Sequence, residues 1–142
     1  MTPKQQAEKF LKEVQKPGRY TGGELNETVK DTSTGEIRAR FAFCFPDAYE
    51  IGMSNLGIKI LYGALNAEKD IWCERAYTPW KDFGDILQRE NIPLYAHESG
   101  DALKDFDIIG FTLQYEMCYT NILYTLSLSQ LPLYAKDRTD DM

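Results

Sequence analysis

The chain has 142 residues, of which 43% are hydrophobic, and its formal net charge is -6 at pH 7. This length is enough for one domain with a real core and too short for two sizeable ones. Because the net charge is negative, the protein has no uniform positive potential that would attract a nucleic-acid phosphate backbone or an anionic lipid surface. We therefore expect one domain, and the acidic charge disfavours nucleic acid as its partner while leaving a local basic patch open.

The sequence shows no targeting or membrane signal. Its first residues lack the apolar core of a signal peptide, and no apolar run approaches the roughly 20 residues of a spanning helix. We expect a cytoplasmic protein without a membrane partner, and the sequence leaves its oligomeric state open.

The cysteines and the single histidine do not form a metal motif. Cys44, Cys73 and Cys118 are too far apart for a zinc ribbon, an iron–sulfur cluster or a redox pair. We expect reduced thiols, with Cys44 and Cys73 buried in strands, and hence no iron–sulfur cluster in this chain. His97 has no second histidine or cysteine at ligand spacing, so a surface or loop position is its default interpretation.

The N-terminal third begins with an expected helix over residues 2–15, which Pro17 and Gly18 end. Residues 25–30 and 36–45 are extended runs on either side of a polar turn cluster at residues 31–35. This arrangement predicts a β-hairpin that leads into the next strand. The predicted organisation is an arm over residues 1–35, followed by an α/β domain over residues 36–142.

Residues 36–45 form the most apolar strand candidate, because both of its faces carry non-polar side chains. A loop over residues 47–55 and a helix over residues 55–66 follow it. A second strand is expected in the middle of residues 70–79, a helix over 79–89, a strand over 106–113 and a helix over 119–129. The alternation predicts a Rossmann-like, doubly wound parallel sheet, with the first strand between the other two. Another strand is expected after residues 136–139, so the sheet is predicted to be truncated.

The loops that leave the carboxyl ends of parallel strands are where open α/β sheets bind ligands. Two such loops are rich in polar and glycine residues, and we expect them to flank one crevice. The candidate cofactor-binding residues are Asp47, Tyr49, Gly52, Ser54, Thr112, Gln114, Tyr115 and Glu116.

Structural interpretations compete with these functional ones. Asp47, Ser54 and Asn55 are all suited to capping a helix. Trp80, Lys81 and Asp82 start a helix at the same edge, where they would either line the crevice or cover the sheet.

The first loop resembles a known motif. Asp47 to Gly52 has the spacing of the D-x-H-x-x-G motif of cobalamin-binding domains, with Tyr49 in the place of the cobalt-ligating histidine. The blocks PDAYEIGMSNLGIKILY, ERAYTPWKD and FDIIGFTLQYEMCYTNIL resemble the amino-terminal region of a bacterial family of radical S-adenosylmethionine (SAM) proteins with a cobalamin-binding-like domain. The likeness runs in collinear blocks over about residues 20–132.

That resemblance implies a downstream partner in the same polypeptide. The family carries a barrel in which a C-x-x-x-C-x-x-C motif holds a [4Fe–4S] cluster that binds SAM, and no such motif occurs in these 142 residues. Thr112 can fill the role of the serine or threonine that follows the third strand, and the family's later Gly-Gly would lie beyond Met142. Tyr49 implies that any cobalamin binds without a histidine ligand, because a phenol is a poor ligand unless ionised.

Three functions remain open from the sequence. The resemblance favours a cobalamin-binding-like module of a radical SAM iron–sulfur enzyme, which is not catalytic alone and presents a corrinoid, or a degenerate corrinoid site, to the barrel. The alternative is a non-catalytic scaffold or interaction domain that kept the fold and lost the ligand. A flavodoxin-like flavin binder is a weaker third interpretation, since no phosphate loop rich in serine and threonine follows the first strand.

Overall fold

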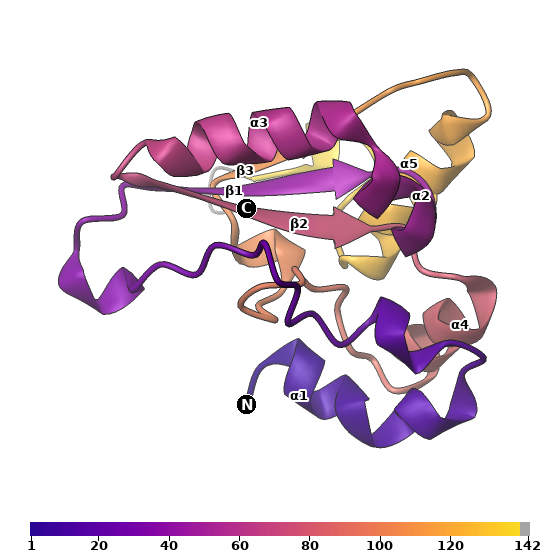
Figure 1. Ribbon diagram of the computed structural model, residues 1–142. Helices are drawn as coiled ribbons and strands as arrows, with labels where there is room; N and C mark the ends of the chain where they lie inside the picture. The colour runs from indigo at the N-terminus through magenta and orange to yellow at the C-terminus, as the bar shows by residue number, and fades with distance from the viewer. Residues whose placement is uncertain (140–142) are drawn as a thin grey trace.

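A parallel sheet of three strands organises the computed structural model, which describes residues 1–139 (Figure 1). The strands are β1 (Ala39–Phe45), β2 (Ile71–Tyr77) and β3 (Ile108–Phe111), and their order is β2-β1-β3. Phe43 of β1 lies opposite Arg75 of β2 and Gly110 of β3. The Rossmann-like class and the central position of β1 are confirmed. β1 takes the centre because its side chains from Phe41 to Phe45 are apolar on both faces.

Helices cover both faces of this sheet. α3 (Leu56–Ala67) packs on one face, where Ile58 and Tyr62 contact Phe43 and Phe45. α4 (Lys81–Arg89), α5 (Cys118–Leu128) and the N-terminal segment pack on the other face, over Ala42 and Cys44 of β1. Figure 1 shows α3 on one side of the strands and α4 with α1 (Pro3–Ala7) on the opposite side. The remaining helical elements are α2 (Tyr49–Ser54) and 3₁₀ turns at Glu8–Glu13, Pro17–Arg19, Thr32–Thr34, Leu103–Asp105 and Ala135–Asp137.

The N-terminal segment is helical where the sequence predicts a helix, but half of it is 3₁₀. The Thr2 side chain accepts a hydrogen bond from the Gln5 N–H, and the Gln5 side chain accepts one from the Thr2 N–H, which forms a capping box for α1. Three of the segment's side chains are buried in the core beneath the sheet: Ala7, Val14 and Tyr20.

The predicted β-hairpin is wrong. Residues 25–30 form no strand, and residues 32–34 form a 3₁₀ turn capped by the Asp31 carboxylate. The physical reason is that β1 already has a parallel neighbour on each side, so it has no free edge for an antiparallel partner. Side chains hold the segment instead: Tyr62 Oη accepts from the Thr28 N–H (2.6 Å), and Trp72 Nε1 donates to the Thr28 carbonyl (2.9 Å).

The outer edge of β2 is closed by hydrogen bonds from outside the sheet. The Asn66 amide pairs with both the N–H and the carbonyl of Cys73, at 3.0 and 2.9 Å. The His97 N–H donates to the Arg75 carbonyl (2.8 Å), and the Glu98 carboxylate accepts from the Arg75 N–H (2.7 Å). No further strand can pair with this edge without breaking these bonds.

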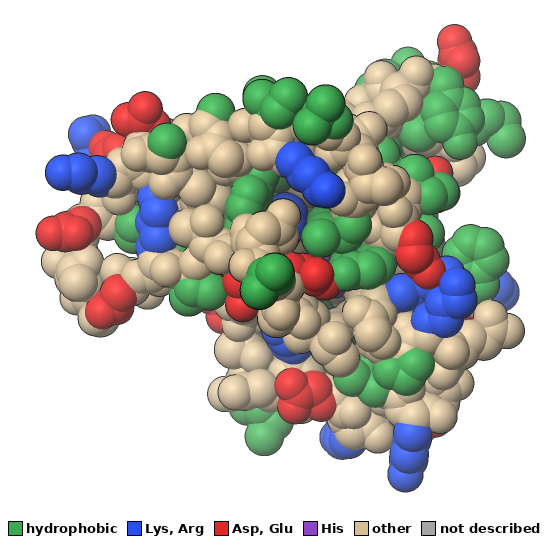
Figure 2. Space-filling view, in the orientation of Figure 1, with side chains coloured by type: hydrophobic (Ala, Val, Ile, Leu, Met, Phe, Trp, Pro, Cys, Tyr) green, Lys and Arg blue, Asp and Glu red, His purple; other side chains and the backbone are tan. Residues whose placement is uncertain are grey.

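The opposite side of the sheet, beyond β3, is exposed and apolar. Beside β3 and α5 lies a groove of about 300 Å³, whose apolar walls include Ile109, Phe111 and Leu126. Figure 2 shows apolar side chains on the surface over α3 and on the loop that projects before α5. The large exposed apolar residues near β3, α3 and α5 are Leu56, Ile60, Leu61, Ile108, Leu113, Tyr115, Met117, Tyr119, Leu123, Leu133 and Tyr134.

Because the Asn66 amide helps to close the β2 edge, we expect its removal to destabilise the fold. We expect Asn66→Ala to lower the free energy of unfolding by about 1–3 kcal/mol, because two backbone groups of β2 lose their partner. Asn66→Asp should also destabilise the fold, since a carboxylate cannot donate to the Cys73 carbonyl. Urea unfolding measures both, with the exposed Lys69→Ala as control. Equal stability of all three variants would contradict this role.

Candidate functional site

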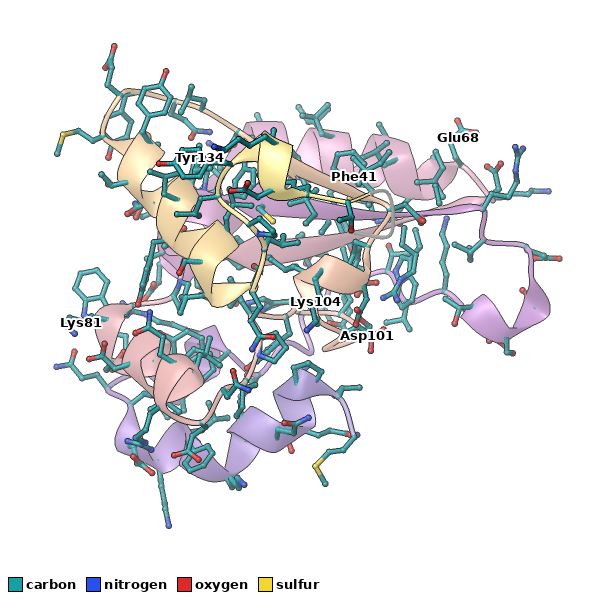
Figure 3. The ribbon with its side chains drawn as sticks, turned by 180° about the vertical axis from the view of Figure 1, so that it is seen from behind. Phe41, Glu68, Lys81, Asp101, Lys104 and Tyr134 are labelled. Carbon is teal, nitrogen blue, oxygen red and sulfur yellow. The ribbon has the colours of Figure 1, made fainter. Side chains whose placement is uncertain are left out.

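A cavity of about 520 Å³ lies at the carboxyl edge of the sheet, between α4 and α5. Its position agrees with the rule that open α/β sheets bind ligands beyond the ends of their strands. Figure 3 shows Lys81 where α4 begins, on the side of the molecule that carries α5. The lining residues come from the ends of β1 and β2 and from both helices: Asp47, Ala48, Thr78, Pro79, Trp80, Lys81, Asp85, Gln88, Asn121 and Tyr124.

The loop after β1 is held in place by its neighbours. The Thr78 N–H donates to the carbonyls of Phe45 (3.2 Å) and Asp47 (3.1 Å), and the Asn121 amide donates to the Pro46 carbonyl (2.9 Å). One oxygen of the Asp47 carboxylate accepts from the Ala48 N–H (2.7 Å). β2 and α5 therefore fix the loop that presents Asp47 to the cavity.

The far wall of the cavity is formed where α5 crosses α4. The hydroxyls of Thr78 and Thr125 share a buried hydrogen bond of 2.9 Å. The Tyr124 hydroxyl lies directly against Gly84, at a place where any side chain would overlap it. Burial, followed by the nearby Asp85 carboxylate, raises the pKa of Tyr124. The phenol is therefore neutral at physiological pH.

Tyr49 is the candidate residue whose placement differs most from that of a ligand-binding side chain. It lies in α2, where the sequence predicts a loop, and its hydroxyl donates to the Glu24 carboxylate of the N-terminal segment. Its ring stacks on His97 (centroids 5.6 Å apart) and meets the edge of Tyr77 (5.4 Å). Burial, together with Glu24, raises the pKa of Tyr49 to about 12. Tyr49 does not line the large cavity.

Gly52 and Ser54 take part in local packing and capping. Gly52 is buried in α2, and a side chain at this position would overlap the ring of Tyr77. The exposed Ser54 hydroxyl donates to the Ile51 carbonyl (2.9 Å). Asn55, rather than Ser54, caps α3, since its side chain accepts from the Ile58 N–H (3.1 Å).

The four candidates after β3 lie away from the cavity. Gln114, Tyr115 and Glu116 are exposed on a loop that projects from the body of the molecule (Figure 1). Thr112 is half-buried, and its enclosed Oγ1 has no hydrogen-bond partner within residues 1–139. Of the eight candidate residues, Asp47 alone lines the cavity at this edge.

His97 is buried, contrary to its default interpretation as a surface or loop histidine. Its exposed fraction is 6%, its ring packs between Tyr49 and Tyr77, and its Nδ1 has no partner among residues 1–139. Burial, and then the positive charges of Lys4 and Arg75, lower the pKa of His97 to about 3. The sequence gives no signal of this burial, because the packing partners are up to 48 positions away (97 − 49).

Other cavity residues were predicted in part. The sequence places Trp80 and Lys81 at the correct edge, through the helix that begins there, and leaves open whether they line a crevice. Asp85, Gln88, Asn121 and Tyr124 carry no such signal, because they lie within helices and reach the cavity only through the crossing of α4 and α5.

Gly52 and Gly63 provide a matched pair of substitutions. We expect Gly52→Ala to lower the free energy of unfolding by about 1–3 kcal/mol, because the new methyl group would displace the Tyr77 ring. Gly63→Ala, on α3 with open space around it, should instead raise stability by about 0.5–1 kcal/mol. Thermal unfolding measures both variants, and a stabilised Gly52→Ala would contradict the packing role.

The burial of His97 predicts that its imidazole titrates at a lower pH in the folded chain than in the unfolded chain. The unfolded imidazole has a pKa of about 6.5, whereas the folded one has a pKa of about 3. As the pH falls from about 6.5 towards 3, the unfolded chain takes up a proton that the folded chain does not, so this group lowers stability by up to about 1.4 kcal/mol per pH unit. His97 is the only histidine, so its NMR signal is unambiguous. It should not titrate between about pH 8 and 5 in the folded chain and should titrate near 6.5 in urea; a folded midpoint near 6.5 would contradict burial.

Comparison with known proteins identifies the family to which the chain belongs. No curated protein and no solved structure matches the chain. A sequence profile with the description "Radical SAM proteins, N-terminal" matches residues 57–142, which is more than half of the chain. The match begins in α3 and includes β2, β3, α4 and α5. The chain therefore belongs to the family of radical SAM protein N-terminal domains.

Proposed function

We propose that this chain is the N-terminal module of a radical SAM enzyme and presents a degenerate cobalamin site, without a histidine ligand, to a catalytic barrel of the same polypeptide. The observation that carries the proposal is the engagement of Tyr49 by Glu24, Tyr77 and His97. A side chain held on three sides is not free to approach a metal ion. His97, which lies behind it, is itself buried.

Family membership supports the assignment of the catalytic chemistry to a separate barrel. In this proposal the barrel binds SAM and the [4Fe–4S] cluster, and the present domain binds neither. Within residues 1–139, no three His, Cys, Asp or Glu side chains are grouped as a metal site would require. Burial raises the pKa of Cys73 to about 12, which disfavours the thiolate that a cluster needs. The same part of the chain contains no helix that could cross a membrane.

The residues around the first loop do not fit a corrinoid. A corrin ring needs open backbone at the strand ends, but the space above Gly52 is filled by Tyr77, and Tyr49 is directed to Glu24. After β3, the Oγ1 of Thr112 has no hydrogen-bond partner within residues 1–139, but Thr112 belongs neither to the first loop nor to the cavity lining. We therefore assign no step of any reaction to a corrinoid on this domain.

The scaffold alternative is favoured by the difference between the two sheet edges. The β2 edge is closed by Asn66, His97 and Glu98, whereas the β3 side is exposed and apolar. An apolar surface of this extent suits contact with another part of the polypeptide. In both functions the module contributes binding surface rather than catalytic groups.

Cobalamin titration of the full polypeptide tests the proposal. After incubation with aquocobalamin under anaerobic conditions and gel filtration, the protein should retain no stoichiometric cobalamin absorbance, because the first loop is filled by Tyr49 and Tyr77. Retention at one cobalamin per chain would contradict the proposal and would favour a corrinoid-presenting module. Electron paramagnetic resonance of the cobalt(II) form tests the ligand separately. If the spectrum showed nitrogen superhyperfine splitting and His97→Gln removed that splitting, His97 would be a cobalt ligand, which would contradict the proposal.

A variant of Tyr49 tests the packing that replaces the ligand. Tyr49→Phe removes the bond to Glu24 and should speed amide hydrogen exchange in residues 20–30, while exchange in β1 stays unchanged. Tyr119→Phe, which removes an exposed hydroxyl, is the matched control. Unchanged exchange in residues 20–30 of the Tyr49 variant would show that this tyrosine does not hold the segment.

A further inference from the structure

The cavity at the carboxyl edge has the size and the mixed lining of a small-molecule site. Its volume of about 520 Å³ falls within the usual range of about 300–1,000 Å³ for ligand pockets. It lies between α4 and α5, whereas the aromatic side chains around Tyr49 lie outside it. A ligand can therefore occupy it independently of the first-loop residues that Tyr77 and Glu24 engage.

The polar groups in the cavity include two acceptors with defined orientation. Pro46 presents a carbonyl to Asn121, so the Asn121 nitrogen must face Pro46, and its oxygen is the atom left to accept a hydrogen bond. The Asp47 carboxylate uses one oxygen for the Ala48 N–H, and its second oxygen has no donor within residues 1–139. A carboxylate and an amide oxygen together favour a ligand that carries N–H donors.

The charges of the cavity favour a cation over an anion. Among the described residues that line the cavity, Lys81 is the only lysine or arginine, and Asp85 pairs with its ammonium group at 2.6 Å. Asp47 is left as the uncompensated charge. Arg19 lies over the Trp80 ring (5.4 Å to its centroid), and this guanidinium group is paired with Glu50 (3.0 Å). A phosphate or carboxylate ligand would meet a net negative site.

Two aromatic side chains belong to the apolar part of the cavity lining, together with Ala48 and Pro79. Trp80 is 52% exposed and belongs to the rim at the start of α4, and Tyr124 lies on the wall from α5. Flat rings of this kind contact planar ligands and attract cations through their π-faces.

We propose that this cavity binds a planar organic cation, an amidinium or an aminated heteroaromatic ring, whose N–H groups bond to Asp47 and Asn121 while its ring lies against Trp80. This goes beyond the proposed function, because it requires neither a corrinoid nor the barrel.

Three probes that share a benzene ring but differ in charge test the proposal on the full chain. Benzamidine is cationic, benzamide is a neutral isostere and benzoate is anionic. Titration followed by NMR shifts of the Trp80 indole should give benzamidine an affinity about tenfold above that of benzamide, the difference expected for a charge-assisted hydrogen bond, and no shift with benzoate. Benzoate binding as tight as benzamidine binding, or no binding of any probe, would overturn the proposal.

Two variants locate the bound probe. Asp47→Asn keeps an acceptor for the Ala48 N–H but removes the charge, and it should reduce benzamidine affinity about tenfold. Asp70→Asn removes the same charge at the start of β2, at the opposite end of the strand, and should leave affinity unchanged. Equal losses in both variants would mean that only the net charge of the protein matters and would contradict a site at Asp47. The indole and amide spectrum of each variant reports whether it is folded.

Discussion

The buried ion pair between Arg75 and Glu98 is the interaction on which the arrangement of this domain depends. Both side chains are almost completely enclosed, with Nε and the carboxylate oxygen 2.7 Å apart. Loss of one partner from such a pair costs about 3–5 kcal/mol, because the other charge stays buried. The same carboxylate accepts from the Arg75 backbone, so the pair also ties the segment after α4 to β2. It thereby fixes His97 behind Tyr49.

The two edges of the sheet differ. On the β2 side, backbone and side-chain groups from Asn66, His97 and Glu98 occupy the positions that another strand would need. On the β3 side, the short strand leaves Ile108 and neighbouring apolar residues exposed. The β2 edge is therefore closed to a further strand, whereas apolar side chains on the β3 side are exposed.

The same packing separates two regions that lie close together in the sequence. Asp47 faces a cavity between α4 and α5, whereas Tyr49, two residues later, belongs to an aromatic group with Tyr77 and His97. Tyr49 is the first residue of α2, whereas Asp47 lies in the loop before the helix, so the two side chains have different surroundings. A motif whose spacing resembles that of a cobalamin site therefore contributes one residue to the cavity at the sheet edge and another to an aromatic cluster.

The sequence by itself determined the α/β class, the parallel sheet and the central strand. The reason is that the apolar side chains on both faces of β1 are stable only when other elements pack on both faces of the sheet. It also placed Asp47 and Trp80 at the correct edge, since strand ends and helix starts follow from local pattern. Only the tertiary structure decided the burial of His97, the contact of Tyr49 with Glu24 and the entry of Asn121 and Tyr124 into the cavity. It also replaced the expected hairpin, because both edges of β1 are paired. These features depend on contacts between segments that are far apart in the sequence, and local hydrophobic periodicity does not predict such contacts.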